Sequence, residues 1–396
     1  MTRRISLKKK ILISFISACI LFFSIADCTA QIEPLSLPND TAVLLQSRIM
    51  PEARSIWIHL PYDYKTTTQR YPVLYLLDGD GHFSYVSPMT DYLSDGDRNN
   101  SPEMIVVGIV NVNRGRDLSP KHPVGSNGKE VNDSIVENAG AGLFLQFIQK
   151  ELIPYIDNRY RTQPYRILMG HSLAGQFALY AKVKSPALFQ ANILVSPAIH
   201  DINEKLIDHF SSLLSSSPTL RNKLFITLGN ENPDKTDRLA AVLNKNASTL
   251  FSWNYKRYTD ENHFSVTYKS IFDGLKFIYK NWYLNFYDTA RYSYSFIQQH
   301  FDRLSKEFGY TIEPNEAYIN TCGYVQLRLG NIDGAIDIFK KNIEKFPASF
   351  NVYDSMGEAY MVKGDKAKAI QFYEKSIELN PGNEDGKEML KKLRKK

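Results

Sequence analysis

The stretch that decides the fold runs from Tyr165 to Tyr180 and reads YRILMGHSLAGQFALY. It begins as a short β-rich run and continues, from Ser172 onward, with the pattern of an amphipathic helix. Gly170 and Ala174 stand two positions on either side of Ser172, where a sharp strand-to-helix turn admits only small residues. Such a turn exposes the serine hydroxyl at the edge of a sheet, so Ser172 is the predicted nucleophile.

This turn departs at one position from the G-x-S-x-G pattern of serine hydrolases. Ala174 occupies the second glycine position and Gly175 follows it, but one extra methyl group is compatible with the turn. The backbone N–H of Leu173 then lies at a helix amino terminus, where it can stabilise an oxyanion. The alternative is that Ser172 only caps a structural helix. His171 is interpreted as a residue of the turn, because neighbours on such a turn point apart.

Strand and helix patterns alternate from about residue 43 to about residue 279. Several strand-like runs are continuously apolar, as expected for strands buried on both faces. The alternation predicts an α/β fold, a mostly parallel sheet with helices on both faces, and an antiparallel hairpin over residues 43–60 at one edge. The predicted strands are Arg54–Leu60, Val73–Leu77, Met104–Val110, Tyr165–Met169, Ala191–Val195, Lys223–Leu228 and Phe251–Tyr258.

The general base and its acid are predicted from their order along the chain. His263 is the histidine that follows the last predicted strand and precedes the final helix of this region, where α/β-hydrolases carry their base. The acid should follow the preceding strand. Glu231 lies closest to the end of that strand and is favoured, with Asp234 as the alternative acid and Asp260, in the histidine loop, as a third candidate.

A second oxyanion donor is expected in the turn Asp78-Gly79-Asp80-Gly81-His82, which follows the predicted strand 73–77. Its glycines allow close backbone approach, and the N–H of Asp80 or Gly79 is the candidate. A metal site made of Asp78, Asp80 and His82 is disfavoured, because no companion cluster of ligands exists. We therefore expect no metal at this turn.

The loop Asn111–Leu118 follows another strand at the same edge of the predicted sheet. Arg114 or Arg116 is a candidate for binding a carboxylate or catecholate group of a substrate. The alternative is an ordinary surface arginine or an ion pair with Asp117 inside the loop.

The carboxyl-terminal region is helical and contains a repeat. Glycine, alanine, aromatic and proline residues recur with a spacing of 34 residues, which is the signature of tetratricopeptide repeats. The pairs are Gly323 and Gly357, Gly330 and Gly364, Ala335 and Ala369, Phe339 and Tyr373, and Pro347 and Pro381. Two repeats are too few to stand alone, so we expect them to dock on the sheet domain through residues 293–308. The helix 385–395 would cap the other end.

The first 30 residues have the pattern of a signal peptide, with a basic start, an apolar run over residues 11–25 and small residues before Gln31. The run is shorter than the roughly 20 residues of a membrane-spanning helix. We therefore expect export to the periplasm or secretion; lipidation at Cys19 and an uncleaved anchor are the alternatives. The segment carries net +4 of the chain's +6, so about +2 remains and no nucleic-acid partner is expected. The composition, 43% hydrophobic and 23% charged, is that of a globular protein.

These regions define the predicted domains: a signal peptide (1–30), an α/β-hydrolase domain (31–283), a connecting helix (284–310) and two tetratricopeptide repeats with a capping helix (311–396). Cys322 falls in the repeats and is interpreted as a buried structural thiol.

Five segments in order resemble the esterase family that includes esterase D and the enterochelin (siderophore) esterases. They are YPVLYLLDGDGHF (71–83), VGIVNVNRGRDLSP (107–120), RILMGHSLAGQFALY (166–180), LFITLGNEN (224–232) and ENHFSV (261–266). The resemblance covers about residues 43–279. It implies a hydrolase of carboxylic esters or thioesters that uses a Ser–acid–His triad without a metal or organic cofactor. The predicted reaction passes through an acyl-enzyme. Relatives cleave siderophore lactones, feruloyl or acetyl esters of polysaccharides and small thioesters, so the resemblance leaves the substrate open, as a small-molecule or saccharide ester.

Two other functions are compatible with the sequence. One is an acyltransferase that uses the same triad, since mycolyltransferases are similar in fold. The other is a binding or scaffold protein that acts through the repeats, which suit a protein partner or self-association.

Overall fold

The computed structural model describes residues 39–62, 64–65, 67–95, 100–120, 140–199, 205–284 and 293–395. These residues belong to one compact unit, Asn39–Lys396. The predicted signal peptide, including Cys19, lies outside the described residues. Across the described part of the chain, no helix combines the length and apolar character needed to cross a bilayer.

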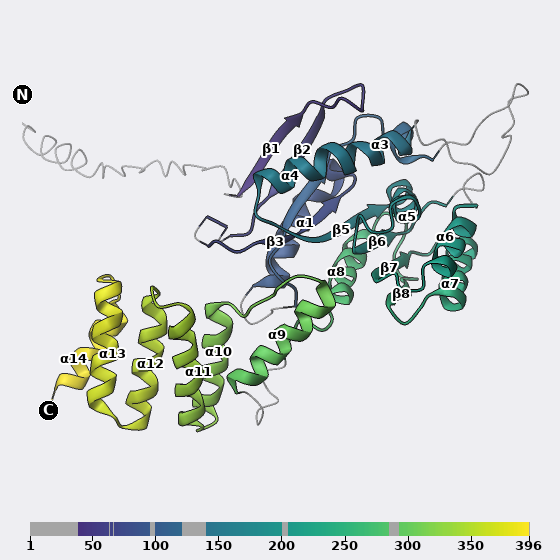
Figure 1. Ribbon diagram of the computed structural model, residues 1–396. Helices are drawn as coiled ribbons and strands as arrows, with labels where there is room; N and C mark the ends of the chain where they lie inside the picture. Colours follow the sequence, from purple (N-terminus) through teal and green to yellow (C-terminus); the bar gives the residue numbers. More distant parts are fainter. Residues whose placement is uncertain are drawn as a thin grey trace, which may run out of the picture. The chain divides into compact units, whose positions relative to one another are not determined.

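An eight-stranded sheet forms the centre of the fold, in the order β1-β2-β4-β3-β5-β6-β7-β8 (Figure 1). Strands β3 through β8 pair in parallel, whereas β2 runs antiparallel to both β1 and β4. The bounds are β1 Asp40–Leu45, β2 Arg54–His59, β3 Tyr71–Leu76, β4 Ile105–Ile109, β5 Thr162–His171, β6 Ala191–Val195, β7 Asn222–Leu228 and β8 Phe251–Arg257. The mostly parallel sheet and its antiparallel edge hairpin are thus confirmed.

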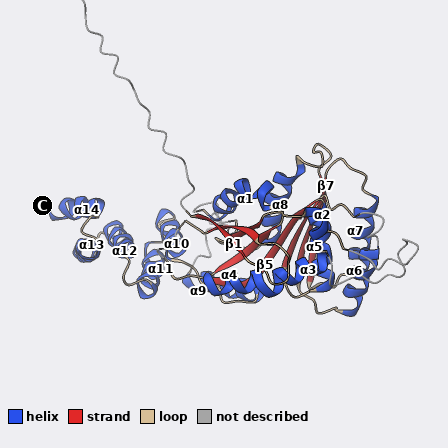
Figure 2. Cartoon of the chain, turned by 90° about the horizontal axis from the view of Figure 1, so that it is seen from above, coloured by secondary structure: helices blue, strands red, loops and turns tan. Residues whose placement is uncertain are grey.

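Helices cover both faces of this sheet, and the side chains on both faces of its central strands are therefore buried. In β3, Val73 and Tyr75 belong to one hydrophobic cluster, and Leu74 and Leu76 belong to the other. Figure 2 shows α1 and α8 on one side of the strands and α3 and α5 on the other. The bounds are α1 Gly79–Ser94, α2 Arg114–Leu118, α3 Ala141–Phe147, a π-helical turn Ile148–Leu152, α4 Ile153–Arg159, α5 Leu173–Lys184, α6 Lys205–Ser216, α7 Asp234–Asn246 and α8 Val266–Ile278.

The remaining helices are α9 Tyr294–Phe308, α10 Glu316–Arg328, α11 Ile332–Lys345, α12 Phe350–Lys363, α13 Lys366–Leu379 and α14 Glu384–Arg394. The repeated glycines explain how α10 packs on α11 and α12 on α13. A Cβ at Gly323 would lie 2.3 Å from the ring of Phe339, and one at Gly357 would lie 3.1 Å from the ring of Tyr373. Each aromatic ring therefore packs directly against the glycine of its own repeat.

The repeats are joined to the sheet domain by α9. Ile297, Phe301, Leu304 and Phe308 of this helix are buried in the same hydrophobic cluster as the α1 and α8 face of the sheet. The ring of Phe308 lies 5.0 Å from the ring of Tyr165 in β5. Docking through the amphipathic stretch 293–308, as expected from the sequence, is confirmed.

An ion pair accompanies this docking. Lys223, at the start of β7, donates to Glu307 Oε1 at 2.5 Å and to the carbonyl oxygen of Ile278 at 2.5 Å. Its side chain is only 11% exposed, and burial lowers its pKa although Glu307 favours the charged form. The α10 helix extends the shared core, where burial raises the pKa of the Cys322 thiol to about 12.

We expect Glu307→Gln to lower the free energy of unfolding by about 1–3 kcal/mol, because a nearly buried ammonium loses its counter-charge. Urea denaturation of the full chain measures the change. Glu313→Gln is the matched control, since Glu313 is 61% exposed and pairs with Lys345 near the surface; its loss should stay below about 0.5 kcal/mol. Equally small losses in both variants would contradict a docking role for the pair.

Candidate active site

The turn between β5 and α5 holds Ser172 in an unusual backbone conformation. Ser172 has φ 58° and ψ −120°, a region that residues with side chains rarely occupy. Its N–H donates to the carbonyl of Val195 at 2.9 Å, and its own carbonyl accepts from the N–H groups of Gln176 and Ala198. These bonds to α5 and to the segment after β6 hold the turn in place.

Small residues make this turn sterically possible. A Cβ at Gly170 would lie 2.2 Å from the carbonyl oxygen of Ala174, closer than any real contact. Ala174 itself is completely buried, and its methyl group is accommodated. The substitution of Ala174 for the usual glycine therefore leaves the turn intact.

A continuous chain of hydrogen bonds connects three loops at the carboxyl edge of the sheet. Ser172 Oγ lies 2.9 Å from Nε2 of His263, and Nδ1 of His263 lies 2.7 Å from Glu231 Oε2. With the imidazole proton on Nδ1, the serine donates to the histidine and the histidine donates to the carboxylate. The loop that carries Glu231 also contacts the loop that carries His263 directly: the N–H of Asn230 donates to the carbonyl of Glu261 at 2.8 Å.

The two alternative acids lie elsewhere. Asp234 is the first residue of α7, and its N–H donates to the side-chain oxygen of Asn232 at 2.9 Å. Asp260 forms an ion pair with Lys269 at 2.7 Å. Of the three candidates, Glu231 is the carboxylate that the structure brings to His263.

His171 has a contact that sequence reasoning did not anticipate. Its Nε2 lies 2.7 Å from the carbonyl oxygen of His263, so Nε2–H donates to the backbone of His263. Burial lowers the pKa of His171 to about 4, which keeps the ring neutral. The rings of His171 and His263 are 4.7 Å apart. The proximity of His171 to Ser172 in the sequence was the available signal.

The expected oxyanion donors lie at the amino termini of two helices. Leu173 begins α5 and Gly79 begins α1, with Asp80 as its second residue. The first N–H groups of a helix lack partners within the helix and attract negative charge. A Cβ at Gly79 would lie 2.8 Å from the backbone of Gly108 and Ile109, so only glycine lets this turn rest on β4.

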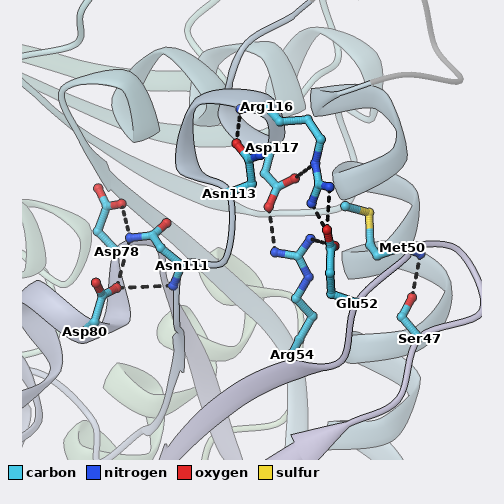
Figure 3. Close-up of polar contacts among 10 residues, drawn as sticks. All are labelled: Ser47, Met50, Glu52, Arg54, Asp78, Asp80, Asn111, Asn113, Arg116 and Asp117. Atoms are coloured by element: carbon cyan, nitrogen blue, oxygen red, sulfur yellow. Dashed lines mark hydrogen bonds and ion pairs between the residues drawn. The ribbon is translucent and has the colours of Figure 1, made fainter.

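The two candidate substrate-binding arginines are engaged within the protein. Arg116 donates from Nη1 and Nη2 to Glu52, at 2.6 Å and 2.9 Å, and from Nε to Asp117 at 2.7 Å (Figure 3). The buried Arg54 also donates to Asp117, at 2.6 Å. Arg116 thus belongs to an ion-pair cluster that includes Asp117, as in the alternative interpretation, and its contact with a substrate stays a prediction. Arg114 makes a bidentate ion pair with Asp78.

The carboxylates of the acidic turn after β3 also accept hydrogen bonds from groups of the protein. The side-chain amide of Asn111 donates to Asp78 Oδ1 at 2.8 Å and to Asp80 Oδ1 at 2.9 Å (Figure 3). His82 is bonded through Nδ1 to the hydroxyl of Tyr85 at 2.7 Å. Among the described residues, no group of three or more His, Cys, Asp or Glu side chains is arranged to hold a metal ion.

Two aromatic side chains that follow His263 in the sequence are exposed. Phe264 follows His263 and is 78% exposed, and Tyr268, one turn into α8, is 57% exposed. The ring of Tyr268 lies 5.9 Å from that of Tyr85 in α1. The ring of Phe264 lies 5.2 Å from that of His263 and therefore presents a flat apolar surface beside the hydrogen-bonded chain.

A cavity of about 910 Å³ lies at the other edge of the sheet. Residues at the start of β3, the end of α1 and the loop between α9 and α10 line it, including Tyr71, Tyr92 and Tyr310. None of Ser172, His263 and Glu231 contributes to its wall.

Known families and solved structures include several that this chain resembles. A family model described as "Putative esterase" matches residues 47–268, and a tetratricopeptide-repeat model matches residues 350–383. Ferri-bacillibactin esterase BesA of Bacillus subtilis (strain 168) is 30% identical over 198 residues, which cover 45% of this chain and 66% of BesA. The match thus spans just under two thirds of that relative.

Two solved structures extend the likeness. The IroE-like serine hydrolase from Shewanella oneidensis is 27% identical, with a TM-score of 0.63, and the match covers 78% of this chain and 99% of that one. An uncharacterised protein from Capnocytophaga ochracea DSM 7271 is 16% identical, with a TM-score of 0.61, over 89% of this chain and 99% of that one. The second likeness concerns the fold alone.

Gly170→Ala should disrupt the turn, because the new methyl group meets the Ala174 carbonyl oxygen at 2.2 Å. We expect a loss of about 3 kcal/mol or more in unfolding free energy. Ala174→Gly, the matched control, only removes a buried methyl group and should cost about 1 kcal/mol. Thermal and urea unfolding of both variants test this; equal stability of the two would contradict the steric account.

Proposed function

Because the chain belongs to the Putative esterase family, we propose that it is a serine hydrolase of carboxylic esters, with Ser172 as nucleophile, His263 as base and Glu231 as the orienting acid. The observation that carries this proposal is the continuous hydrogen-bond chain from Ser172 Oγ through His263 to Glu231. A serine hydroxyl is a weak nucleophile unless an adjacent base accepts its proton.

The reaction has two acyl-transfer steps. Nε2 of His263 takes the hydroxyl proton as Ser172 Oγ attacks the ester carbonyl carbon, and the oxyanion is stabilised by the N–H of Leu173 and that of Asp80 or Gly79. The tetrahedral intermediate expels the alcohol, which receives the proton from His263, and an acyl-enzyme remains. Water then attacks the acyl-enzyme with His263 again as base, which releases the acid and restores the serine.

The carboxylate of Glu231 stabilises the imidazolium that forms in each step. It also holds the histidine in the tautomer that leaves Nε2 free to accept the serine proton. His171 fixes the backbone of His263 from the other side without taking a charge at neutral pH, since its pKa is lowered to about 4.

For the substrate we propose a siderophore ester or an acylated saccharide. The esterase from Bacillus subtilis is named for ferri-bacillibactin, which supports the first class. The exposed ring of Phe264, 5.2 Å from the ring of His263, suits a substrate with flat faces, as both classes have. We further propose that the protein is exported, on the pattern of its first 30 residues, and that the repeats bind a protein partner.

Ser172→Ala should lower the turnover of p-nitrophenyl acetate by about 10³- to 10⁶-fold, because the nucleophile is lost. A fluorophosphonate probe should label the wild type and spare this variant. Ser185→Ala, at the far end of α5, is the control and should keep wild-type turnover. Undiminished hydrolysis by Ser172→Ala would overturn the proposal. If the variant is inactive, a panel of siderophore, feruloyl, acetyl-saccharide and thioester substrates offered to the wild type identifies the ester.

Glu231→Gln should reduce kcat by about 10²- to 10⁴-fold while the chain stays folded, because the amide no longer stabilises the imidazolium. Asp234→Asn, three residues along the chain, is the matched control and should change kcat by less than about twofold. Steady-state kinetics on one neutral ester compares the two. The opposite ranking would transfer the acidic role to Asp234.

A further inference from the structure

We propose that Arg114 is a positioning residue that joins the two turns supplying the oxyanion donors, through its ion pair with Asp78 and its contact with the His171 carbonyl. This inference rests on the proposed esterase function. It assigns Arg114 a role in placing backbone N–H groups, in place of the direct contact with a substrate that the sequence suggested.

Arg114 lies between the two turns. From the first residue of α2, its Nε donates to Asp78 Oδ1 at 2.7 Å and its Nη2 donates to Asp78 Oδ2 at 2.9 Å. The same Nη2 lies 3.3 Å from the carbonyl oxygen of His171, the residue that precedes Ser172. One planar guanidinium therefore contacts the turn after β3 and the turn after β5.

Asp78 needs such a partner for two reasons. Its backbone is left-handed, with φ 53° and ψ 46°, which is unfavourable for a residue other than glycine. Its carboxylate is only 9% exposed, and a nearly buried charge requires a counter-charge or hydrogen bonds. Arg114 supplies the charge and Asn111 adds a hydrogen bond at 2.8 Å. The next residue, Gly79, begins the helix that carries one oxyanion donor.

The geometry of the donors depends on this connection. An oxyanion pocket made from two separate turns works only when its N–H groups are held within about 0.5 Å of the productive arrangement. Leu173 follows the turn that Arg114 contacts at His171, and Gly79 and Asp80 follow Asp78. A bidentate bond to one turn and a single bond to the other fix their separation. Shortening or removing the guanidinium would let the turns move independently.

The test compares Arg114→Lys, Arg114→Gln and Asp78→Asn with the wild type on the neutral ester p-nitrophenyl acetate. Lysine keeps the charge but cannot make the bidentate bond, so it preserves the fold while loosening the connection. We expect kcat to fall by about tenfold to a hundredfold in each variant, with KM changed by less than about threefold.

Binding of a trifluoromethyl ketone, which forms a tetrahedral adduct with the serine, is the second readout. Its affinity should fall in parallel with kcat, because the adduct uses the oxyanion donors that a ground-state ester does not fully use. The double variant Asp78→Asn/Arg114→Gln should lose little more than either single variant, since both changes break one connection. Arg166→Gln is the control: Arg166 lies in β5, pairs with Asp157 at 2.8 Å and contacts neither turn.

Each outcome decides between roles for Arg114. A rise in KM for anionic esters with kcat unchanged would overturn the positioning role in favour of substrate binding. Unchanged kcat and inhibitor affinity, or losses equal to those of Arg166→Gln, would also overturn it. Absence of hydrolysis and of ketone binding in the wild type would instead refute the proposed esterase function.

Discussion

The backbone of Ser172 is the constraint on which the rest of this structure depends. A residue with a side chain can hold φ near 58° only when several groups fix it, and here the carbonyl of Val195 and the N–H groups of Gln176 and Ala198 do so. Those partners come from the last residue of β6, from the segment after it and from α5, so the turn requires the parallel pairing of β5 with β6. The strained serine is thus a product of the whole sheet.

The same turn determines what its neighbours are. Gly170 has no room for a Cβ, while the Ala174 methyl group is buried without conflict. On one side of Ser172, His171 contacts the backbone of His263; on the other, Leu173, the expected oxyanion donor, begins α5. A single tight turn therefore positions Ser172, the residue that contacts the backbone of His263, and the first N–H of α5.

Much of the fold could be predicted because buried parallel strands appear in the sequence as runs of apolar residues. Ala191–Val195 was predicted with the bounds of β6, whereas β5 extends from Thr162 to His171, beyond its apolar run. Its extra residues are held by pairing with β3 and β6, which no local pattern reveals. The order of the strands, with β4 between β2 and β3, is likewise a tertiary property.

The candidate site likewise has parts that the sequence predicts and parts that depend on tertiary structure. Ser172 and His263 were predicted from their places after strands, which depend on chain order alone. The partners of the arginines depend on which strands are adjacent: Arg114 meets Asp78, 36 residues away, because β4 pairs with β3. Arg116 meets Glu52 because β4 also pairs with β2. Since one sequence does not give the strand order, the substrate-binding interpretation of these arginines had no means of excluding such ion pairs.

The two ends of the strands serve different parts of the chain. Ser172, Glu231 and His263 all follow carboxyl ends, whereas α9 contacts Tyr165 and Lys223, which lie toward the amino ends of β5 and β7. The repeats therefore share the core of the sheet without supplying a group to the hydrogen-bonded chain.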